Sequence, residues 1–593
     1  MNGDEPTRGV EGNRALLQRA VQHHHAGALG KAIGLYRQVL DGAAQAGDGT
    51  ETADVQGEVW RLLGIALRAN GEPSRALEAL DNALARTPGD TSVLVERSAA
   101  LQDLGRSADA VDALRAIIPL TSESILGHAS LADAYRALRQ SDDAIAHYRR
   151  LVELAPDLID ARINLGVCLQ EAGNINAAVS CYRAAMAADP DSGAAATNLG
   201  LALMATDDLI GAVAPLERGA ALDPTDPLAL NGLGAMYLRL GRTGDAEQAI
   251  RRAIDASPGH APAWSNLGNV YQDQRRLDDA LSAHEKAVSL DPDNAELHWN
   301  RAMTLLLSGD LKRGFVAYEW RRRTMDHAPP GHDSPLWDGG DPTGKHVLLL
   351  AEQGFGDIIQ FARYAPVLAA RGARVTLACP PKLADLFNSL GDDIALVTNS
   401  ADARDIDCHA PLMSLPFLCE TTMNTIPVGV PYLSSPPGAV HPPPPSGRRR
   451  IGLCWTGNPD HPDNPHRSCP LDAFAPLFER DDVEWISLQY GHGAAAGADA
   501  DRVTDWTAFL EGFANTAAAM DSLDLVITID TSTAHLAGAL GRPTWLLLKY
   551  TPDWRWMLDR DDSPWYPTVR LFRQTRPGRW DDVIARLVDN LEP

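Results

Sequence analysis

A spacing of 34 residues runs through the first half of the chain and limits its fold more than any other feature. Seven alanines keep this spacing without a gap: Ala76, Ala110, Ala144, Ala178, Ala212, Ala246 and Ala280. Six prolines keep the same phase: Pro88, Pro156, Pro190, Pro224, Pro258 and Pro292. A fixed period of this length indicates an array of stacked structural repeats rather than a single globular core.

Each 34-residue unit is expected to form two helices joined by a turn. The small Gly and Ala positions let the two helices approach closely, and the proline closes the unit because it cannot continue a helix. The pattern resembles the tetratricopeptide repeat over about residues 57–294, with a degenerate first unit near 13–46 and a poorly matching last unit from about 295. We therefore expect an α-solenoid over residues 13–325.

One polar position recurs in the array, two residues before the small residue of the first helix. Four units carry asparagine there: Asn164, Asn198, Asn266 and Asn300. A carboxamide both donates and accepts hydrogen bonds, so a row of them can hold a protein or peptide by its backbone on the concave surface. Similar asparagine ladders line the repeats of O-GlcNAc transferase. The alternative is that these are solvated positions, or consensus residues common to many repeats.

The acidic balance of the chain limits its partners. Its 593 residues include 53 Lys or Arg and 78 Asp or Glu, which gives a net charge of −25 at pH 7 and disfavours broad binding to nucleic acid. No stretch approaches the roughly 20 apolar residues that span a bilayer, and the N-terminus lacks a secretion signal. Seven cysteines without a CxxC pair are typical of reduced thiols. We therefore expect a cytoplasmic protein without a transmembrane segment.

Beyond about residue 325 the 34-residue period disappears, and strands are expected to alternate with helices. The expected strands are 346–351, 373–378, 394–398, 407–413, 450–455, 483–489, 523–529 and 544–548. The expected helices are 357–371, 471–479, 514–522, 534–540 and 580–591. This alternation favours parallel sheets with crossover helices. The proline-rich stretch Pro436–Pro445 divides two α/β units, 345–435 and 449–593, whose ligands would bind at the carboxyl ends of the strands.

The most informative segment is Leu523–Pro543, LDLVITIDTSTAHLAGALGRP. A strand leads directly into a helix, whose first-turn amides and dipole form an anion site. The hydroxyls of Thr531, Ser532 and Thr533 can donate to the phosphates of a nucleotide donor, and His535 can contact a phosphate or a sugar. The alternative is plain N-capping by Asp530 or Thr531.

The pattern D-T-x-x-x-H-L-A-x-A-L-G-x-P in this segment resembles the nucleotide-diphosphate motif of the heptosyltransferase group, glycosyltransferase family 9. Two further loops are similar to that family: Gln353–Asp357 resembles its Gly-Asp loop, and Trp455–Asn458 its W-x-G segment. The resemblance covers about residues 345–593 and implies the GT-B fold of twin Rossmann domains, which O-GlcNAc transferase shares. Ser532 departs from the family, which commonly has Gly there.

The resemblance also implies roles for single residues. Asp357 would be the base that takes a proton from the acceptor hydroxyl, although it can equally be the cap of its helix. Arg467 would stabilise the leaving nucleoside diphosphate, although it can also be a surface arginine paired with Asp460 or Asp463. The remaining loop residues expected near donor or acceptor are Gly354, Gly356, Trp455, Gly457, Asn458 and Asp530.

The sequence therefore predicts a glycosyltransferase that uses a nucleotide-sugar donor and a protein or glycan acceptor, with inversion by family analogy. Because fixed positive groups can stabilise the leaving group, we expect neither a metal site nor a cofactor. The alternative is a scaffold that binds partners through its repeats and carries a degenerate transferase domain. The aromatic clusters Trp554–Trp556 and Trp565–Tyr566 favour a packed wall between domains over a surface for sugar stacking.

Overall fold

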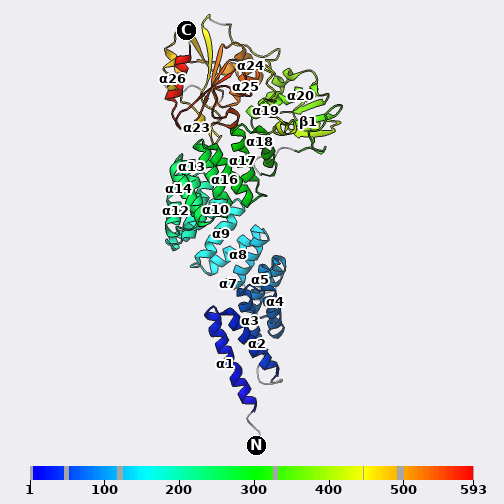
Figure 1. Ribbon diagram of the computed structural model, residues 1–593, viewed down its shortest axis with the longest axis vertical. Coiled ribbons are helices and arrows are strands. Elements are labelled where there is room, and N and C mark those ends of the chain that lie inside the picture. The colour runs from blue at the N-terminus through cyan, green and yellow to red at the C-terminus, as the bar shows by residue number, and fades with distance from the viewer. Residues whose placement is uncertain are drawn as a thin grey trace. The chain divides into compact units, whose positions relative to one another are not determined.

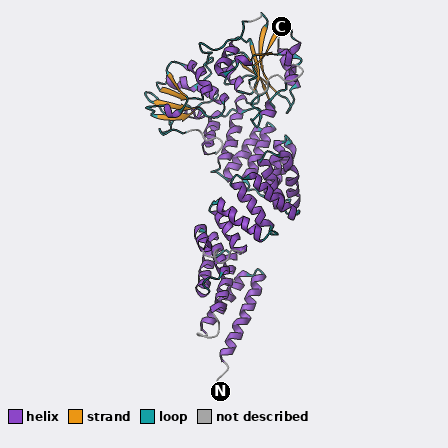
Figure 2. Cartoon of the chain, turned by 180° about the vertical axis from the view of Figure 1, so that it is seen from behind, coloured by secondary structure: helices purple, strands orange, loops and turns teal. Residues whose placement is uncertain are grey.

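The computed structural model describes residues 5–45, 53–115, 125–324, 331–444, 447–490 and 500–591. The chain divides into two compact units, Met1–Ala256 and Ser257–Pro593. The first unit consists of helices, whereas strands are confined to the second (Figure 1; Figure 2). Within the described ranges, no helix combines the length and the apolar character that crossing a bilayer requires.

The described residues of the first unit form seven successive helix pairs. Their bounds are α1 Glu5–His25, α2 Leu29–Gln45, α3 Ala53–Ala69, α4 Pro73–Arg86, α5 Thr91–Asp103, α6 Ser107–Arg115, α7 Ile125–Ala137, α8 Ser141–Leu154, α9 Ile159–Glu171, α10 Ile175–Ala188, α11 Gly193–Ala205, α12 Leu209–Leu222, α13 Pro227–Arg239 and α14 Thr243–Ala256. The two helices of a pair pack together, and the second helix of each pair from α2 to α12 packs on the pair that follows it. The predicted helix–turn–helix repeats are confirmed.

The repeating glycines explain how closely these helices pack. A Cβ atom on Gly166 would lie 2.5 Å from the ring of Tyr182, which stands sixteen residues later on the partner helix. The same spacing places Leu216 against Gly200 and Ile250 against Gly234. In these pairs the glycine has no side chain, and a large side chain of the partner helix fills the space.

The second unit begins with the last repeats of the array. These are α15 Ala261–Asp273, α16 Leu277–Leu290, α17 Ala295–Leu307 and α18 Leu311–Tyr318, followed by the 3₁₀ helix η2 Glu319–Arg323. The poorly matching last unit still forms a helix pair, with Gly314 packed on Leu306. Helices α17 and α18 share one hydrophobic core with the α/β region, and Leu277 and Leu281 of α16 pack against it. In this core the rings of Phe315 and Trp554 meet edge to face at 5.7 Å.

The first sheet has four parallel strands in the order β3-β2-β1-β4. Its elements are β1 His346–Leu350, α19 Phe355–Ala362, α20 Tyr364–Ala370, β2 Arg374–Ala378, α21 Pro381–Phe387, β3 Ile394–Val397, β4 Cys408–Pro411 and α22 Leu415–Leu418. All five residues of β1 are buried, as expected for a central strand covered on both faces. In register, Val347 pairs with Val375 on one side and with Cys408 on the other.

The second sheet has six parallel strands in the order β10-β9-β8-β5-β6-β7. Its elements are β5 Arg449–Cys454, α23 Asn464–Arg467, β6 Val483–Ser487, β7 Thr504–Asp505, α24 Gly512–Asp521, β8 Leu525–Ile529, α25 Ser532–Ala539, β9 Thr544–Leu548, β10 Val569–Arg573 and α26 Asp581–Asn590. Both sheets place their first strand beside their fourth. This is the doubly wound order, in which ligands bind where the winding direction reverses.

The expected parallel sheets are thus present, with local differences. The helix expected over 471–479 is two 3₁₀ turns, and between them stands Pro476, which has no amide hydrogen to donate to a helical hydrogen bond. The helix expected over 357–371 is divided at Arg363 into α19 and α20. Strands β7 and β10 were not predicted. The boundary between the compact units falls inside the array, so the domain limits 13–325, 345–435 and 449–593 remain predictions.

Candidate functional site

The first turns of two helices meet, one following a strand of the first sheet and the other a strand of the second. Helix α19 follows β1 and helix α25 follows β8, and the two helices pack together. Gly356 makes this approach possible, since a Cβ atom there would lie 2.7 Å from the imidazole of His535 and 3.5 Å from the backbone of Ser532. The structure therefore joins the two loops that the sequence had singled out as separate motifs.

The start of α25 combines a side-chain cap with partly exposed hydroxyls. Thr531 is the N-cap, and its hydroxyl accepts a hydrogen bond from the amide of Thr533 at 3.3 Å. Thr531, Ser532 and Thr533 are all half-buried. The capping role that the sequence left open between Asp530 and Thr531 belongs to Thr531, and capping by one hydroxyl leaves the helix dipole available to a ligand.

His535, which was predicted to contact a phosphate or a sugar, is buried in the structure. It is 5% exposed, its Nδ1 lies 3.0 Å from the hydroxyl of Tyr566, and its ring packs on Trp556. Burial, together with the cations Arg555 and Arg363, holds the pKa of His535 well below its usual value. A neutral imidazole therefore forms part of the wall where α25 meets α19.

Both carboxylate oxygens of Asp357 are engaged. Oδ2 accepts a hydrogen bond from the amide of Gly354 at 3.0 Å, so Asp357 does serve as a cap for α19. Oδ1 forms an ion pair with Nη2 of Arg555. A base role for Asp357 thus requires an acceptor hydroxyl to take the place of one of these partners.

Arg555 is the central buried cation of the site. It is 6% exposed and donates to Asp553 at 2.9 Å and to Gln360 at 2.6 Å, while its guanidinium lies 4.3 Å from the ring centre of Trp554. Burial alone disfavours its charge, but Asp553 and Asp357 hold its pKa above the usual value. The nearby aromatic residues are all buried: Trp554, Trp556, Trp565 and Tyr566. The predicted packed wall is confirmed.

Asp530 follows β8 and stands at the entrance to α25. Burial raises the pKa of its carboxyl to about 7, with the nearby Asp553 adding to the effect. Its backbone carbonyl accepts a hydrogen bond from Nη1 of Arg467 at 2.9 Å. Arg467 therefore lies at the carboxyl end of β8, beside the N-terminus of α25.

The predicted alternative partner of Arg467 is occupied elsewhere. Asp463 pairs with Nζ of Lys549 at 2.7 Å, so Arg467 is not held there by this carboxylate. Sequence reasoning missed Lys549, although a lysine directly after the strand 544–548 lies at the same sheet edge as Asp530. The edge therefore carries two cations, Arg467 and Lys549.

The loop after β5 is held by carboxamides. Gln489 is 5% exposed and donates to the carbonyl of Thr456 at 2.8 Å, and Asn464 accepts from the amide of Gly457 at 2.9 Å. A Cβ atom on Gly457 would lie 2.8 Å from Nη2 of Arg467, so glycine leaves room for this guanidinium.

The other two predicted residues of this loop take different places. Trp455 is 6% exposed and belongs to the core beneath the sheet. Asn458 is exposed and caps its own turn by accepting from the amide of Asp460 at 3.1 Å. Of the four loop residues, Gly457 and Arg467 are the ones beside α25.

A turn of the repeat array also reaches this edge. Thr551 donates to the carbonyl of Asp273 at 3.3 Å, and Arg275 donates to the carbonyl of Leu558 at 3.0 Å. Burial raises the pKa of Asp273, and the Lys549 ammonium acts against that rise. Repeat residues therefore contribute to the surroundings of the candidate site, and no sequence pattern predicted this contact.

The four asparagines of the predicted ladder are half-buried on first helices of their repeats. Asn198 donates to the carbonyl of Ala194 within its own helix at 2.9 Å, whereas Asn300 donates to the hydroxyl of Ser265 in the neighbouring repeat at 3.0 Å. First helices pack on one another, α9 on α11 and α15 on α17. Peptide binding by Asn164, Asn198, Asn266 and Asn300 stays a prediction.

Comparison with known families identifies the repeats. Tetratricopeptide repeat models match residues 18–162, 135–200, 211–261 and 261–294. The relative "Protein FlbA" of Caulobacter vibrioides (strain ATCC 19089 / CIP 103742 / CB 15) is 27% identical over 339 residues, which cover 50% of this chain and 55% of FlbA. The chain therefore spans about half the length of this relative. The repeats are tetratricopeptide repeats, and the transferase resemblance of residues 345–593 stays a prediction.

Solved structures of other repeat proteins are similar to parts of the chain. A tetratricopeptide repeat protein from Parabacteroides merdae ATCC 43184 is 16% identical, covering 42% of this chain and 98% of its own, with a TM-score of 0.37. The APC/C hetero-tetramer Cut9–Hcn1 is 16% identical, covering 52% and 72%, with a TM-score of 0.36. YrrB, described as a TPR protein with an unusual peptide-binding site, is 23% identical, covering 32% and 96%, with a TM-score of 0.26.

Proposed function

We propose that the chain is a GT-B-type glycosyltransferase that moves a sugar from a nucleotide-diphosphate donor to a protein or glycan acceptor recruited by the repeats. One observation carries this proposal. The N-termini of α19 and α25 meet at the carboxyl ends of two parallel, doubly wound sheets, with Arg467 bonded to the carbonyl of Asp530 beside them. Such an edge is where doubly wound folds bind nucleotides.

The donor diphosphate lies at the N-terminus of α25. The first-turn amides and the dipole of this eight-residue helix favour an anion, and the hydroxyls of Ser532 and Thr533 add donors. Arg467 and Lys549 supply fixed positive charge as the leaving group becomes more negative. Charge stabilisation of this kind does not depend on a metal ion.

The acceptor hydroxyl approaches from the side of α19. Asp357 accepts its proton, and the ion pair with Arg555 fixes where the carboxylate stands. Asp530, whose pKa is about 7, changes protonation near neutral pH and lies at the same sheet edge. The pH dependence of transfer is therefore expected to include a group near pH 7.

The repeats bring the acceptor to this edge. Tetratricopeptide arrays present a concave surface to proteins or peptides, and the turn at Asp273 already lies at the candidate site. An extended segment held by Asn266 and Asn300 on α15 and α17 would thus be close to the edge along the same repeats.

A scaffold without catalysis is the second candidate, and two observations favour it. Both oxygens of Asp357 have partners, and His535 is buried. In that case the repeats bind partner proteins, and the α/β region is a folded domain without catalytic activity. Nucleotide binding separates the two functions.

The experiment measures the affinity of the full chain for UDP, ADP, GDP and the corresponding sugar nucleotides by calorimetry. We expect one diphosphate class to bind, and Arg467→Ala to weaken that binding at least tenfold because a charge-assisted contact is lost. Arg579→Ala is the matched control, since Arg579 is an exposed arginine paired with Asp581. Absence of binding by the wild type at millimolar concentration would favour the scaffold.

A further inference from the structure

The loop between β1 and α19 has an unusual backbone. Gln353 takes a φ of 63°, a left-handed conformation that is uncommon for a residue with a side chain. A conformation of this kind persists only where the surroundings hold it. The same loop carries Gly354 and Gly356, whose backbones contact Asp357 and α25 respectively.

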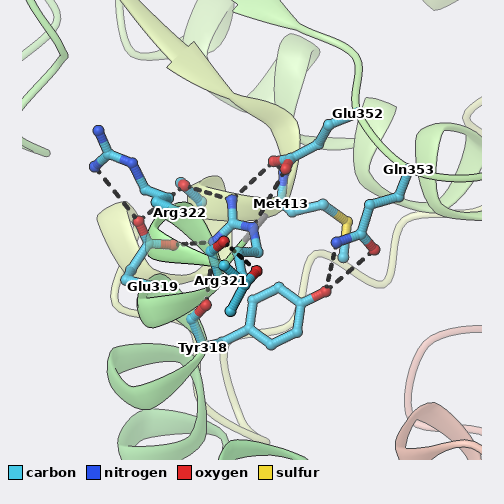
Figure 3. Close-up of polar contacts among 9 residues, drawn as sticks. Tyr318, Glu319, Arg321, Arg322, Glu352, Gln353 and Met413 are labelled. Carbon is cyan, nitrogen blue, oxygen red and sulfur yellow. Dashed lines mark hydrogen bonds and ion pairs between the residues drawn. The ribbon is translucent and has the colours of Figure 1, made fainter. Parts of the chain in front are cut away.

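Arg321, in the short helix that ends the repeat array, holds the first residue of this loop. Its side chain is fully buried and bonds both oxygens of Glu352, with Nη2 at 2.8 Å from Oε1 and Nε at 3.2 Å from Oε2 (Figure 3). Nη2 also lies 2.8 Å from the hydroxyl of Ser414, and Glu352 accepts from the amide of Met413 at 2.9 Å. A bidentate contact of this kind fixes the orientation of the Glu352 carboxylate as well as its distance from Arg321.

Tyr318, one turn earlier on α18, holds the second residue. Its hydroxyl lies 3.1 Å from Nε2 and 3.2 Å from Oε1 of Gln353 (Figure 3). The side chain is 1% exposed, and its ring packs on Trp299 of α17 at 4.8 Å. The left-handed residue is therefore bonded to a rigid, buried phenol of the last repeat.

We propose that Tyr318 and Arg321 are positioning residues of the candidate site, and that the last tetratricopeptide repeat holds the loop Glu352–Gly356 in the shape that presents Asp357 to a substrate. The array then both recruits an acceptor and sets the geometry of the loop that meets it. For its catalytic consequence this inference rests on the proposed function. The positioning itself is measurable without turnover.

The test is hydrogen–deuterium exchange of the full chain, followed in the peptide that spans residues 352–358. Tyr318→Phe keeps the packed ring and removes only the hydroxyl. We expect exchange in this peptide to become about tenfold faster, with little change in the melting temperature. Arg321→Lys keeps the charge but loses the bidentate contact with Glu352, and it should also raise the exchange rate of the 352–358 peptide. Tyr237→Phe is the control, since it removes a similar hydroxyl bond, to Glu217, in the first unit.

Activity adds a second, separable readout. If the transferase proposal is right, Tyr318→Phe should lower kcat about tenfold while the Kd for UDP or ADP stays the same, because the diphosphate binds at α25 rather than at this loop. Unchanged exchange in the 352–358 peptide of both variants would overturn the positioning role. Faster exchange without any transfer by the wild type would support positioning and count against the proposed function.

Discussion

Different kinds of side chain hold the first unit together and hold the candidate site together. In the repeats, helix pairs are joined by shape, as in Gly166 with Tyr182 and Gly200 with Leu216. Among the described residues of the first unit, no Lys, Arg, Asp or Glu side chain is fully buried. Among the described residues of the second unit, five arginines are buried, and three of them join elements far apart in the chain: Arg321, Arg363 and Arg555, which are 0%, 2% and 6% exposed.

This difference teaches where each region tolerates change. At an apolar packing contact, a substitution changes the free energy of unfolding in proportion to the volume that is removed or added, so its effects are graded. A buried ion pair that loses one partner leaves an uncompensated charge, and the cost is large at once. The repeats should therefore accept apolar substitution of similar volume, while the site should not accept loss of a single arginine.

The largest effect is expected for Arg555→Met. The substitution leaves Asp357 and Asp553 without their shared cation, and we expect the free energy of unfolding of the second unit to fall by about 3–5 kcal/mol. Urea unfolding followed by tryptophan fluorescence measures this change. Arg579→Met is the control, because an exposed pair contributes about 0–1 kcal/mol. A loss below about 1 kcal/mol for Arg555→Met would contradict the comparison.

The second largest effect is expected at His284, a titratable residue at a repeat position where other helix pairs have a tyrosine or an aliphatic side chain. His284 stands sixteen residues after Gly268, where other repeats have Tyr182, Leu216 or Ile250. It is fully buried, and within the described residues neither ring nitrogen has a hydrogen-bond partner. Burial lowers the pKa of His284 to about 4.

A lowered pKa of a base makes the native state lose stability as the pH falls. Above pH 6.5 the imidazole is neutral in both the native and the unfolded state. Between pH 6.5 and about 4 it is protonated in the unfolded state but stays neutral in the native state. The second unit should therefore lose about 3 kcal/mol over that window. His284→Leu should remove this part of the acid sensitivity, measured as unfolding free energy at pH 7 and pH 4.5. An unchanged difference between the two pH values would show that His284 is not its source.

The smallest effect is expected for Gly166→Ala in the first unit. The added methyl group meets the Tyr182 ring at 2.5 Å, so we expect a loss of about 2 kcal/mol from overpacking, seen as a lower urea midpoint. Gly34→Ala is the matched control, since nothing lies within 4 Å of its Cβ position on α2. That control should gain about 0.5–1 kcal/mol from helix propensity. Equal effects of the two substitutions would show that close packing is not why Gly166 is small.

Much of the fold follows from spacing that the sequence shows directly. The 34-residue period predicts the helix pairs because each pair packs mainly on its neighbours, and apolar runs after residue 345 predict eight of the strands. Strand β10, VRLFR, was missed because its arginines interrupt the apolar run, and Pro476 ended a helix that the apolar pattern favoured. Local rules fail where single residues override the pattern.

The candidate site was only partly predictable for a different reason. Loops after strands could be identified, since they end at one sheet edge, and Gly356, Arg467 and Thr531 do lie near the start of α25. The ion pair of Asp357 with Arg555 could not, because residues 198 positions apart in the chain are brought together only by tertiary packing. The contact of Asp273 with Thr551 depends on the same packing.

The division of the array at residue 256 also bears on how such a chain can evolve. Leu306 and Phe315 of the last repeats share one core with Trp554 of the α/β region. Duplication or deletion of one 34-residue unit before residue 257 leaves this core intact, whereas a deletion within 257–324 removes part of it. The number of repeats before residue 257 can therefore change in whole units, while the last two repeats are inherited together with the α/β region.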